Sequence, residues 1–213
     1  MLPESPRANS RTFGVVILAA GASVRMGRPK LLLPWRGTSI IGHLIAEWRD
    51  LGAAQIAVVC RPADDALQAE LDRLAFPRTD RIHNPDAGRG MFSSIQSAAG
   101  WNGWRQDLTG WAIVLGDQPH LQTATLRRLV ALRETHPHAI CQPRFGERVG
   151  HPVMLPWAVF AGLRTTATAT LKDFLSETAG EKIECAVDDA GLRLDLDRPE
   201  DYEKALNLHS RTS

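Results

Sequence analysis

Apolar residues along the chain form seven short runs separated by segments of helical periodicity. The first run, residues 13–18, is continuously apolar and rich in β-branched side chains, which is typical of a strand buried on both faces of a parallel sheet. Six further runs predict strands at residues 55–60, 81–84, 111–115, 139–143, 149–155 and 182–187. Because strand-like and helix-like segments alternate, the pattern predicts a βαβ architecture.

The segments between the runs carry apolar residues at helical spacing. They predict helices at residues 38–51, 63–74, 91–100 and 123–135, the last with Thr123 as its N-cap. Near the end, Asp197 and Pro199 indicate the start of a helix over residues 200–208. Since no linker or repeat divides the chain, we predict one α/β domain over residues 13–209, preceded by a disordered tail at residues 1–12.

Composition narrows the class of protein. The 213 residues are 44% hydrophobic and 23% charged, as in a globular domain, and the net charge of +1 argues against a protein that binds nucleic acid by broad electrostatic attraction. Three cysteines without CxxC spacing indicate neither a disulfide framework nor a cysteine zinc site, so we expect a reducing, cytoplasmic location. No apolar run is long enough to predict a membrane span.

The strongest chemical signal directly follows the first predicted strand. Small residues at positions 19–23 let the backbone approach a ligand and turn N–H groups toward phosphate oxygens, and Arg25 and Lys30 add charge. Gly21 and Gly27 alone would fit an ordinary tight turn. The chain has neither GxxxxGK[ST] nor GxGxxG after this strand, which disfavours a P-loop kinase or a dinucleotide-dependent dehydrogenase. The segment therefore indicates a nucleoside triphosphate cradle.

Carboxylates occur at two further places. Asp117, in Gly116-Asp117-Gln118-Pro119, follows the strand at 111–115, and ligands bind at the carboxyl ends of strands in open α/β sheets. Its carboxylate suits Mg²⁺, although a turn or helix cap is the alternative. Asp195 and Asp197 alternate on one side of an extended segment, where they either share a cation or repel each other.

Two more segments carry polar candidates. The loop from Asn84 leads into the helix at 91–100, and its N–H groups and hydroxyls could read a base or ribose, or Ser93 or Ser94 could simply cap the helix. His151 is a candidate ligand-binding residue, but a lone histidine is more often structural. No pattern indicates covalent catalysis.

These motifs together resemble the MobA-like nucleotidyltransferases. LAAGxSxRMGxPKLLLP at residues 18–34 resembles the signature of the molybdenum cofactor cytidylyltransferase branch, and Ala20 and Pro29 favour CTP, because the guanylyltransferases more often have LAGG and Asp-Lys. The family's other motifs then follow in its order: a GMxSSI-like loop at residues 90–95, GDQP at 116–119, GHP at 150–152 and a DxDxPEDY segment at 195–202. Arg198 replaces the usual Thr in the last motif.

The resemblance implies a three-layer Rossmann-like fold, Mg²⁺ as cofactor, and particular roles for residues. It makes Asp117 the first metal ligand and Asp197 the second, with Asp195 behind it, and makes Arg25, Lys30 and Asp117 catalytic. His151 becomes an acceptor-binding residue. The implied nucleotide-binding residues are Leu18, Ala19, Ala20, Gly21, Ser23, Arg25, Lys30, Gly90, Met91, Ser93 and Ser94.

The implied reaction transfers CMP from CTP to a molybdopterin-type acceptor, with a molybdoenzyme or cofactor chaperone as protein partner. One departure concerns the acceptor: residues 167–172 read ATATLK where the family often has a Gly-Ala-Arg segment. Three alternatives stay open. These are a GTP-using guanylyltransferase, a sugar- or alcohol-phosphate nucleotidyltransferase, and a non-catalytic nucleotide sensor or cofactor chaperone.

Overall fold

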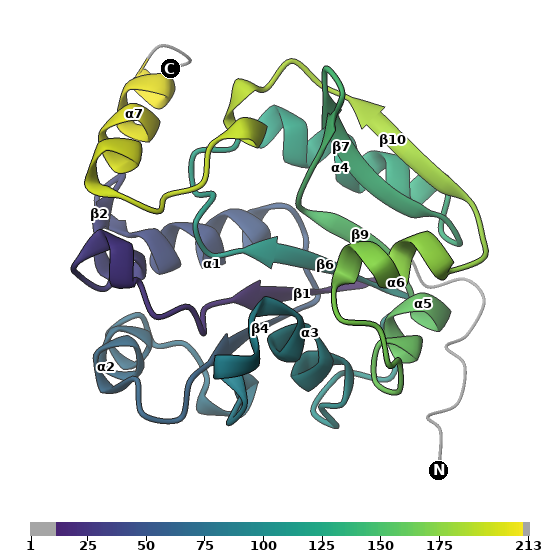
Figure 1. Cartoon of the computed structure of the whole chain (residues 1–213), viewed down its shortest axis with the longest axis horizontal. Coiled ribbons are helices and arrows are strands. Elements are labelled where there is room, and N and C mark those ends of the chain that lie inside the picture. Colours follow the sequence, from purple (N-terminus) through teal and green to yellow (C-terminus); the bar gives the residue numbers. More distant parts are fainter. Residues whose placement is uncertain (1–11, 211–213) are drawn as a thin grey trace.

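A mixed but mostly parallel sheet forms the centre of the computed structural model, which describes residues 12–210 (Figure 1). Seven strands follow the order β10-β7-β9-β6-β1-β4-β5, and β8 pairs with β7. Only β8 and β9 run antiparallel to their neighbours in this sheet. The strands are β1 (Phe13–Leu18), β4 (Gln55–Cys60), β5 (Arg81–His83), β6 (Gly110–Leu115), β7 (Ile140–Phe145), β8 (Arg148–Val149), β9 (Val153–Pro156) and β10 (Lys182–Ala186). The predicted parallel α/β sheet is confirmed.

Helices cover both faces of the sheet and complete a three-layer domain (Figure 1). They are α1 (Ile40–Asp50), α2 (Asp65–Arg73), α3 (Met91–Ala99), α4 (Thr123–Thr135), α5 (Trp157–Gly162), α6 (Leu171–Glu177) and α7 (Pro199–Ser210). A two-stranded ribbon, β2 (Pro34–Trp35) and β3 (Thr38–Ser39), precedes α1. No helix of residues 12–210 has the length and apolarity that crossing a membrane requires.

The central strand β1 supplies side chains to both layers of the core. Val15 and Ile17 pack with the α1 side, whereas Val16 packs with the α3 side, because successive side chains of a strand point to opposite faces. All three are fully buried. Burial of each such side chain contributes about 1.5–3 kcal/mol, so the continuous apolar run of β1 anchors the sheet between its helices.

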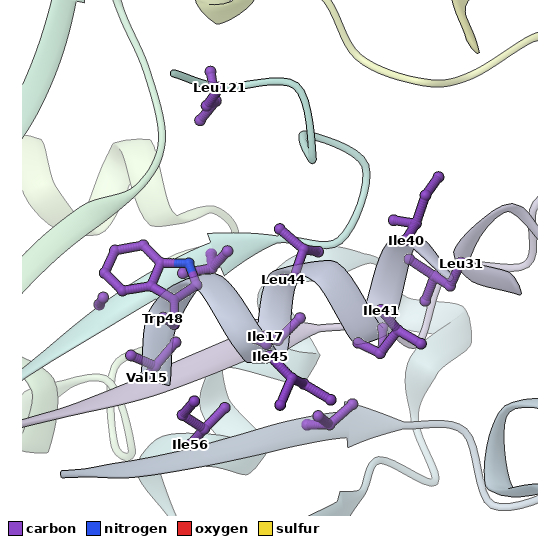
Figure 2. Packing of buried hydrophobic residues seen from close by; sticks show 14 of the residues in the cluster. Val15, Ile17, Leu31, Ile40, Ile41, Leu44, Ile45, Trp48, Ile56 and Leu121 are labelled. Carbon is purple, nitrogen blue, oxygen red and sulfur yellow. The ribbon is translucent and has the colours of Figure 1, made fainter. Parts of the chain in front are cut away.

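Helix α1 shows how the periodicity becomes packing. Ser39 caps it by accepting a hydrogen bond from the Gly42 N–H at 3.1 Å. Its apolar residues then recur every three or four positions and face the sheet over Val15, Ile17 and Ile56 (Figure 2). The helix residues in this layer are Ile40, Ile41, Leu44, Ile45 and Trp48.

Two local predictions were wrong. Residues 149–155 are not one strand: β8 forms a hairpin with β7 through Gly146 at φ 60°, whereas β9 lies between β7 and β6.

Thr123 is not the N-cap of α4 but its first residue, and its hydroxyl donates to Glu47 at 2.8 Å. Burial raises the pKa of the Glu47 carboxyl, and this hydrogen bond opposes the rise.

Two helices have no counterpart among the predicted elements. Helices α5 and α6 are six and seven residues long, too short for apolar periodicity to distinguish them from loops. The tail predicted at residues 1–12 lies outside the described residues except for Thr12.

Candidate active site

The loops that follow four neighbouring strands gather at one edge of the sheet. Strands β6, β1, β4 and β5 are adjacent and parallel, so their carboxyl ends lie together. Residues 19–23 follow β1, Asp117 follows β6, Arg61 follows β4 and Asn84 follows β5. The sheet thus brings together chemical groups from four distant parts of the chain.

Lys30 forms ion pairs with both predicted metal ligands, Asp117 and Asp197. Its Nζ lies 2.7 Å from Asp117 Oδ2 and 3.8 Å from Asp197 Oδ1, and Arg25 contacts the other oxygen of Asp197 at 2.9 Å. The Lys30 side chain is only 14% exposed, compared with 65% for Arg25. The geometry therefore brings all four residues into one network, in which Lys30 is largely shielded from solvent and Arg25 is exposed.

A backbone hydrogen bond attaches the Asp197 segment to the Asp117 loop. The Leu196 N–H donates to the Asp117 carbonyl at 3.1 Å. Asp195 points to other groups, accepting from Gln118 at 2.8 Å and facing Arg148 at 3.6 Å. The two carboxylates of the Asp195–Asp197 pair therefore have separate partners, and Asp197 is the one that meets Asp117 at Lys30.

The donor set of this network fits a divalent cation. Asp117 Oδ1 is buried and has no hydrogen-bond partner within the described residues, so one acceptor oxygen is open to a ligand. Among the side chains that the structure describes, no group of three His, Cys, Asp or Glu residues is suited to a metal. Mg²⁺, however, commonly binds through one or two carboxylates and takes its other ligands from substrate phosphates and water.

Two cavities flank the loop at residues 19–22. One, of about 320 Å³, lies between this loop, residues 87–91 and Asp117. The other, of about 330 Å³, lies between this loop, the residues around Ser23–Pro29, and α2. Each is at the lower end of the range typical of small-molecule sites, roughly 300–1,000 Å³.

The predicted nucleotide-binding residues of the loop after β1 lie at these cavities. Leu18, Ala19, Ala20 and Gly21 line the first, and Ser23 lines the second. Ser23 adopts a left-handed conformation, and its Oγ accepts a hydrogen bond from the Lys30 N–H at 3.3 Å. Arg25 joins the site through Asp197.

The first turn of α3 and its N-cap contribute three of their four predicted residues to the first cavity. Gly90, Met91 and Ser94 line it, whereas the Ser93 hydroxyl donates to the Asp86 and Gly90 carbonyls. Asn84 holds both serines, donating from Nδ2 to each hydroxyl at 2.9 and 3.0 Å. Neither serine is the N-cap of α3, which is Gly90.

His151 precedes β9 and lies against β6 at Ile113. Its Nδ1 is 3.3 Å from the Ile113 carbonyl, and burial lowers the pKa of its imidazole, which is therefore uncharged at neutral pH. Asp117 and Asp195 act on the ring electrostatically and oppose this lowering. The ring is thus near enough to Asp117 for that charge to act on it, and its contact with an acceptor stays a prediction.

The family model described as "MobA-like NTP transferase domain" matches residues 15–183. This chain belongs to the MobA-like NTP transferase family. The matched range contains Arg25, Lys30, Asp117 and both cavities, whereas Asp197 lies beyond it. The family resemblance inferred from the motifs is confirmed.

Curated relatives of this MobA-like chain include several enzymes. It is 36% identical over 134 residues to the bifunctional protein GlmU of Clavibacter sepedonicus, an alignment that covers 61% of this chain and 25% of GlmU. It is 25% identical to the molybdenum cofactor cytidylyltransferase of Escherichia coli, covering 88% of this chain and 92% of that protein. The guanylyltransferase of Xanthomonas euvesicatoria is 33% identical, over 57% of this chain and 55% of its own length.

The MobA-like fold is also similar to solved structures. Rv0371c from Mycobacterium tuberculosis superposes with a TM-score of 0.77 at 30% identity, covering 93% of this chain and 99% of that one. A second structure of Rv0371c, in complex with manganese, has a TM-score of 0.66 at 26% identity, covering 92% and 98%.

Sequence reasoning missed one residue of this MobA-like site. Arg61 directly follows β4 and lines both cavities. A polar residue at the carboxyl end of a predicted central strand was the available signal, because ligands bind at that edge.

Gly90 offers a test of the cavity wall formed by residues 87–91. Its φ of 95° and ψ of 179° fall in a region that essentially only glycine adopts. Gly90→Ala is expected to cost about 1–3 kcal/mol of strain and to weaken nucleotide binding by displacing Met91. Chemical denaturation and a nucleotide titration measure both effects. Gly52→Ala is the control, because Gly52 has a similar φ of 85° but lies outside both cavity linings, and an equal loss of nucleotide binding in the two variants would contradict the prediction.

Proposed function

We propose that this protein is a Mg²⁺-dependent nucleotidyltransferase that transfers CMP from CTP to a phosphorylated acceptor, molybdopterin carrying molybdenum, and releases pyrophosphate. The observation that carries the proposal is the network in which Lys30 lies between Asp117 and Asp197 beside the small-residue loop. This network offers both signs of charge that a nucleotide with a metal needs.

In the proposed reaction, an oxygen of the acceptor phosphate attacks the α-phosphorus of CTP. A new P–O bond forms as the bond between the α-phosphorus and its bridging oxygen breaks, and pyrophosphate leaves with the electron pair. A phosphate monoester has a second pKa of about 6 and is largely dianionic at neutral pH, so no protein base is required. Alignment and charge neutralisation are the work left to the protein.

The residues of the network divide this work. Lys30 is pre-positioned by its two carboxylate partners and offsets negative charge on the phosphates, and Arg25 adds a more exposed cation. Asp117 and Asp197 would hold the metal, with the unpartnered Asp117 Oδ1 as one donor. Bound Mg²⁺ would supply charge neutralisation at the transferring phosphoryl group. The manganese complex of Rv0371c supports a divalent cation in a protein of similar fold.

The identities of the nucleotide donor and of the acceptor are proposed from sequence motifs and from one alignment. Ala20 and Pro29 and the alignment along 88% of the chain to a cytidylyltransferase favour CTP and a molybdopterin-type acceptor. His151, which lies against β6 at Ile113, is the proposed acceptor contact. A molybdoenzyme or cofactor chaperone is the proposed recipient, and a reducing cytoplasm the proposed location.

Calorimetric titration with CTP, GTP, ATP and UTP in the presence of Mg²⁺ tests the donor. The proposal predicts that CTP binds at least about tenfold more tightly than the others, a difference of about 1.4 kcal/mol. Preference for GTP would instead indicate a guanylyltransferase. Absence of binding by all four would reject the nucleotide cradle.

The acceptor and the reaction are tested by pyrophosphate release. Purified protein is mixed with CTP and Mg²⁺ and with either molybdenum-loaded molybdopterin or a hexose 1-phosphate. Release with molybdopterin supports the proposal. Release with the sugar phosphate supports the alternative of a sugar-phosphate nucleotidyltransferase. Tight CTP binding without release in either mixture would indicate a nucleotide sensor or cofactor chaperone.

Metal removal gives a separate prediction. Treatment with EDTA is expected to lower pyrophosphate release by at least about 100-fold, because Lys30 and Arg25 are paired with Asp117 and Asp197, and without the metal the charge of the triphosphate is not neutralised. Adding excess Mg²⁺ is expected to restore the rate. Unchanged turnover in EDTA would contradict the assignment of a metal site to these carboxylates, and Ca²⁺ added in place of Mg²⁺ controls for general ionic effects.

A further inference from the structure

Arg61 is one of the residues that line both cavities. Strand β4 pairs in parallel with β1 up to the Leu18–Val59 pair, so Arg61 emerges at the same edge as the loop at 19–22. Arg61 and Lys30 line both cavities, together with the small residues of that loop. A ligand that passes from one cavity to the other must pass these two cations.

The charge of Arg61 is less fully compensated than that of Lys30 or Arg25. Lys30 and Arg25 contact carboxylates at 2.7 and 2.9 Å, whereas Arg61 reaches Asp64 only at 3.4 Å. Arg61 Nε is buried and has no hydrogen-bond partner within the described residues. A buried donor without a partner costs free energy, and an anion with several acceptor oxygens would satisfy it.

The carboxylate opposite Arg61 is held by another interaction. Asp64 caps α2, and its Oδ1 accepts a hydrogen bond from the Leu67 N–H at 3.2 Å. Only the second oxygen, Oδ2, faces Arg61. The guanidinium therefore has its planar fork largely available for a ligand, and this fork matches the geometry of phosphate oxygens.

The residues that line the two cavities indicate which part of a nucleotide Arg61 would contact, the phosphates or the base. The first cavity includes residues 87–91, the proposed base or ribose side. The second is lined instead by Ser23, Gly27 and Arg28. Because Arg61 borders both, it lies between the base side and a loop of small residues and cations, as a polyphosphate chain requires.

We propose that Arg61 binds the β- and γ-phosphates of the nucleoside triphosphate and gives the site its preference for triphosphate over monophosphate. This inference rests on the proposed function and adds a specificity-determining residue to it. Asp64 acts as the resident counter-ion that the phosphates displace.

The test compares CTP, CMP and inorganic pyrophosphate by calorimetry, each with Mg²⁺, on the full chain. Arg61→Gln is expected to weaken CTP and pyrophosphate binding about 10- to 100-fold, the loss of a charge-assisted hydrogen-bond pair, and to change CMP binding less than about twofold. Arg61→Lys, which keeps the charge but loses the fork, is expected to lie between. Asp64→Asn keeps a capping oxygen, removes the competing charge, and is expected to tighten CTP binding severalfold.

Arg73→Gln is the matched control, since Arg73 is an exposed arginine of α2 paired with Glu70 and lies away from both cavity linings. It is expected to leave all three affinities unchanged. Equal weakening of CTP and CMP in Arg61→Gln would overturn the inference and assign Arg61 to the CMP part of the nucleotide, and unchanged CTP binding in both Arg61 variants would overturn it outright. Failure of the proposed function is a different result, because the unaltered chain would then bind no nucleoside triphosphate.

Discussion

Replacing Asp117 with asparagine is expected to lower turnover by about 10²- to 10³-fold while moving the melting temperature by only a few degrees. The substitution keeps the size of the side chain but removes the charge that faces Lys30 at 2.7 Å and the anionic donor that Asp117 Oδ1 provides. Lys30 keeps its contact with Asp197 at 3.8 Å, so it loses only one of its own two ion pairs.

The measurement is pyrophosphate release alongside a thermal melt. Asp107→Asn is the control, because Asp107 is an exposed aspartate in the loop that precedes β6 and pairs with Arg105 at 2.7 Å. That variant is expected to keep full turnover. A parallel loss of activity and stability in Asp117→Asn would mean that the residue supports the fold rather than the reaction, and full activity would remove it from the mechanism.

Replacing Trp111 with alanine is expected to have the opposite effect, with stability lost and chemistry preserved. Trp111 is 4% exposed and stacks on Phe160 with ring centroids 4.4 Å apart, and Trp104 packs edge-on at 5.9 Å. Truncating a buried tryptophan typically costs about 3–5 kcal/mol, through lost transfer free energy and the cavity left behind. Trp111 lies at the amino end of β6, whereas Asp117 follows its carboxyl end, so the site should keep its geometry.

Urea denaturation measures this loss, and turnover is measured at a temperature where the variant remains folded. Trp157→Ala is the control, because Trp157 is only partly buried at the start of α5 and its truncation should cost less. A Trp111→Ala variant with unchanged stability would show that the stacked aromatic cluster contributes little to the fold. Reduced turnover of a fully folded Trp111→Ala variant would show that the two ends of β6 are coupled.

The local elements of this fold were predictable because each depends on nearby residues. The continuous apolar run of β1 reflects burial on both faces of the sheet. The apolar residues of α1 recur every three or four positions because one face of that helix is buried. Prediction failed where long-range pairing decides the outcome. The break between β8 and β9 depends on which strands they join, and Thr123 meets Glu47, a residue far away in sequence.

The same division applies to the site. The family, the small-residue loop, and Asp117 and Asp197 as candidate ligands could be predicted from the chain's motifs, since each motif is a short run with its own chemistry. The contact of Lys30 with both carboxylates, the contacts of Asp195 with Gln118 and Arg148, and the position of Arg61 at both cavities depend on the folded arrangement. The physical reason is that strand order and register set which loop ends meet, and these arise from packing of the whole sheet rather than from any one segment.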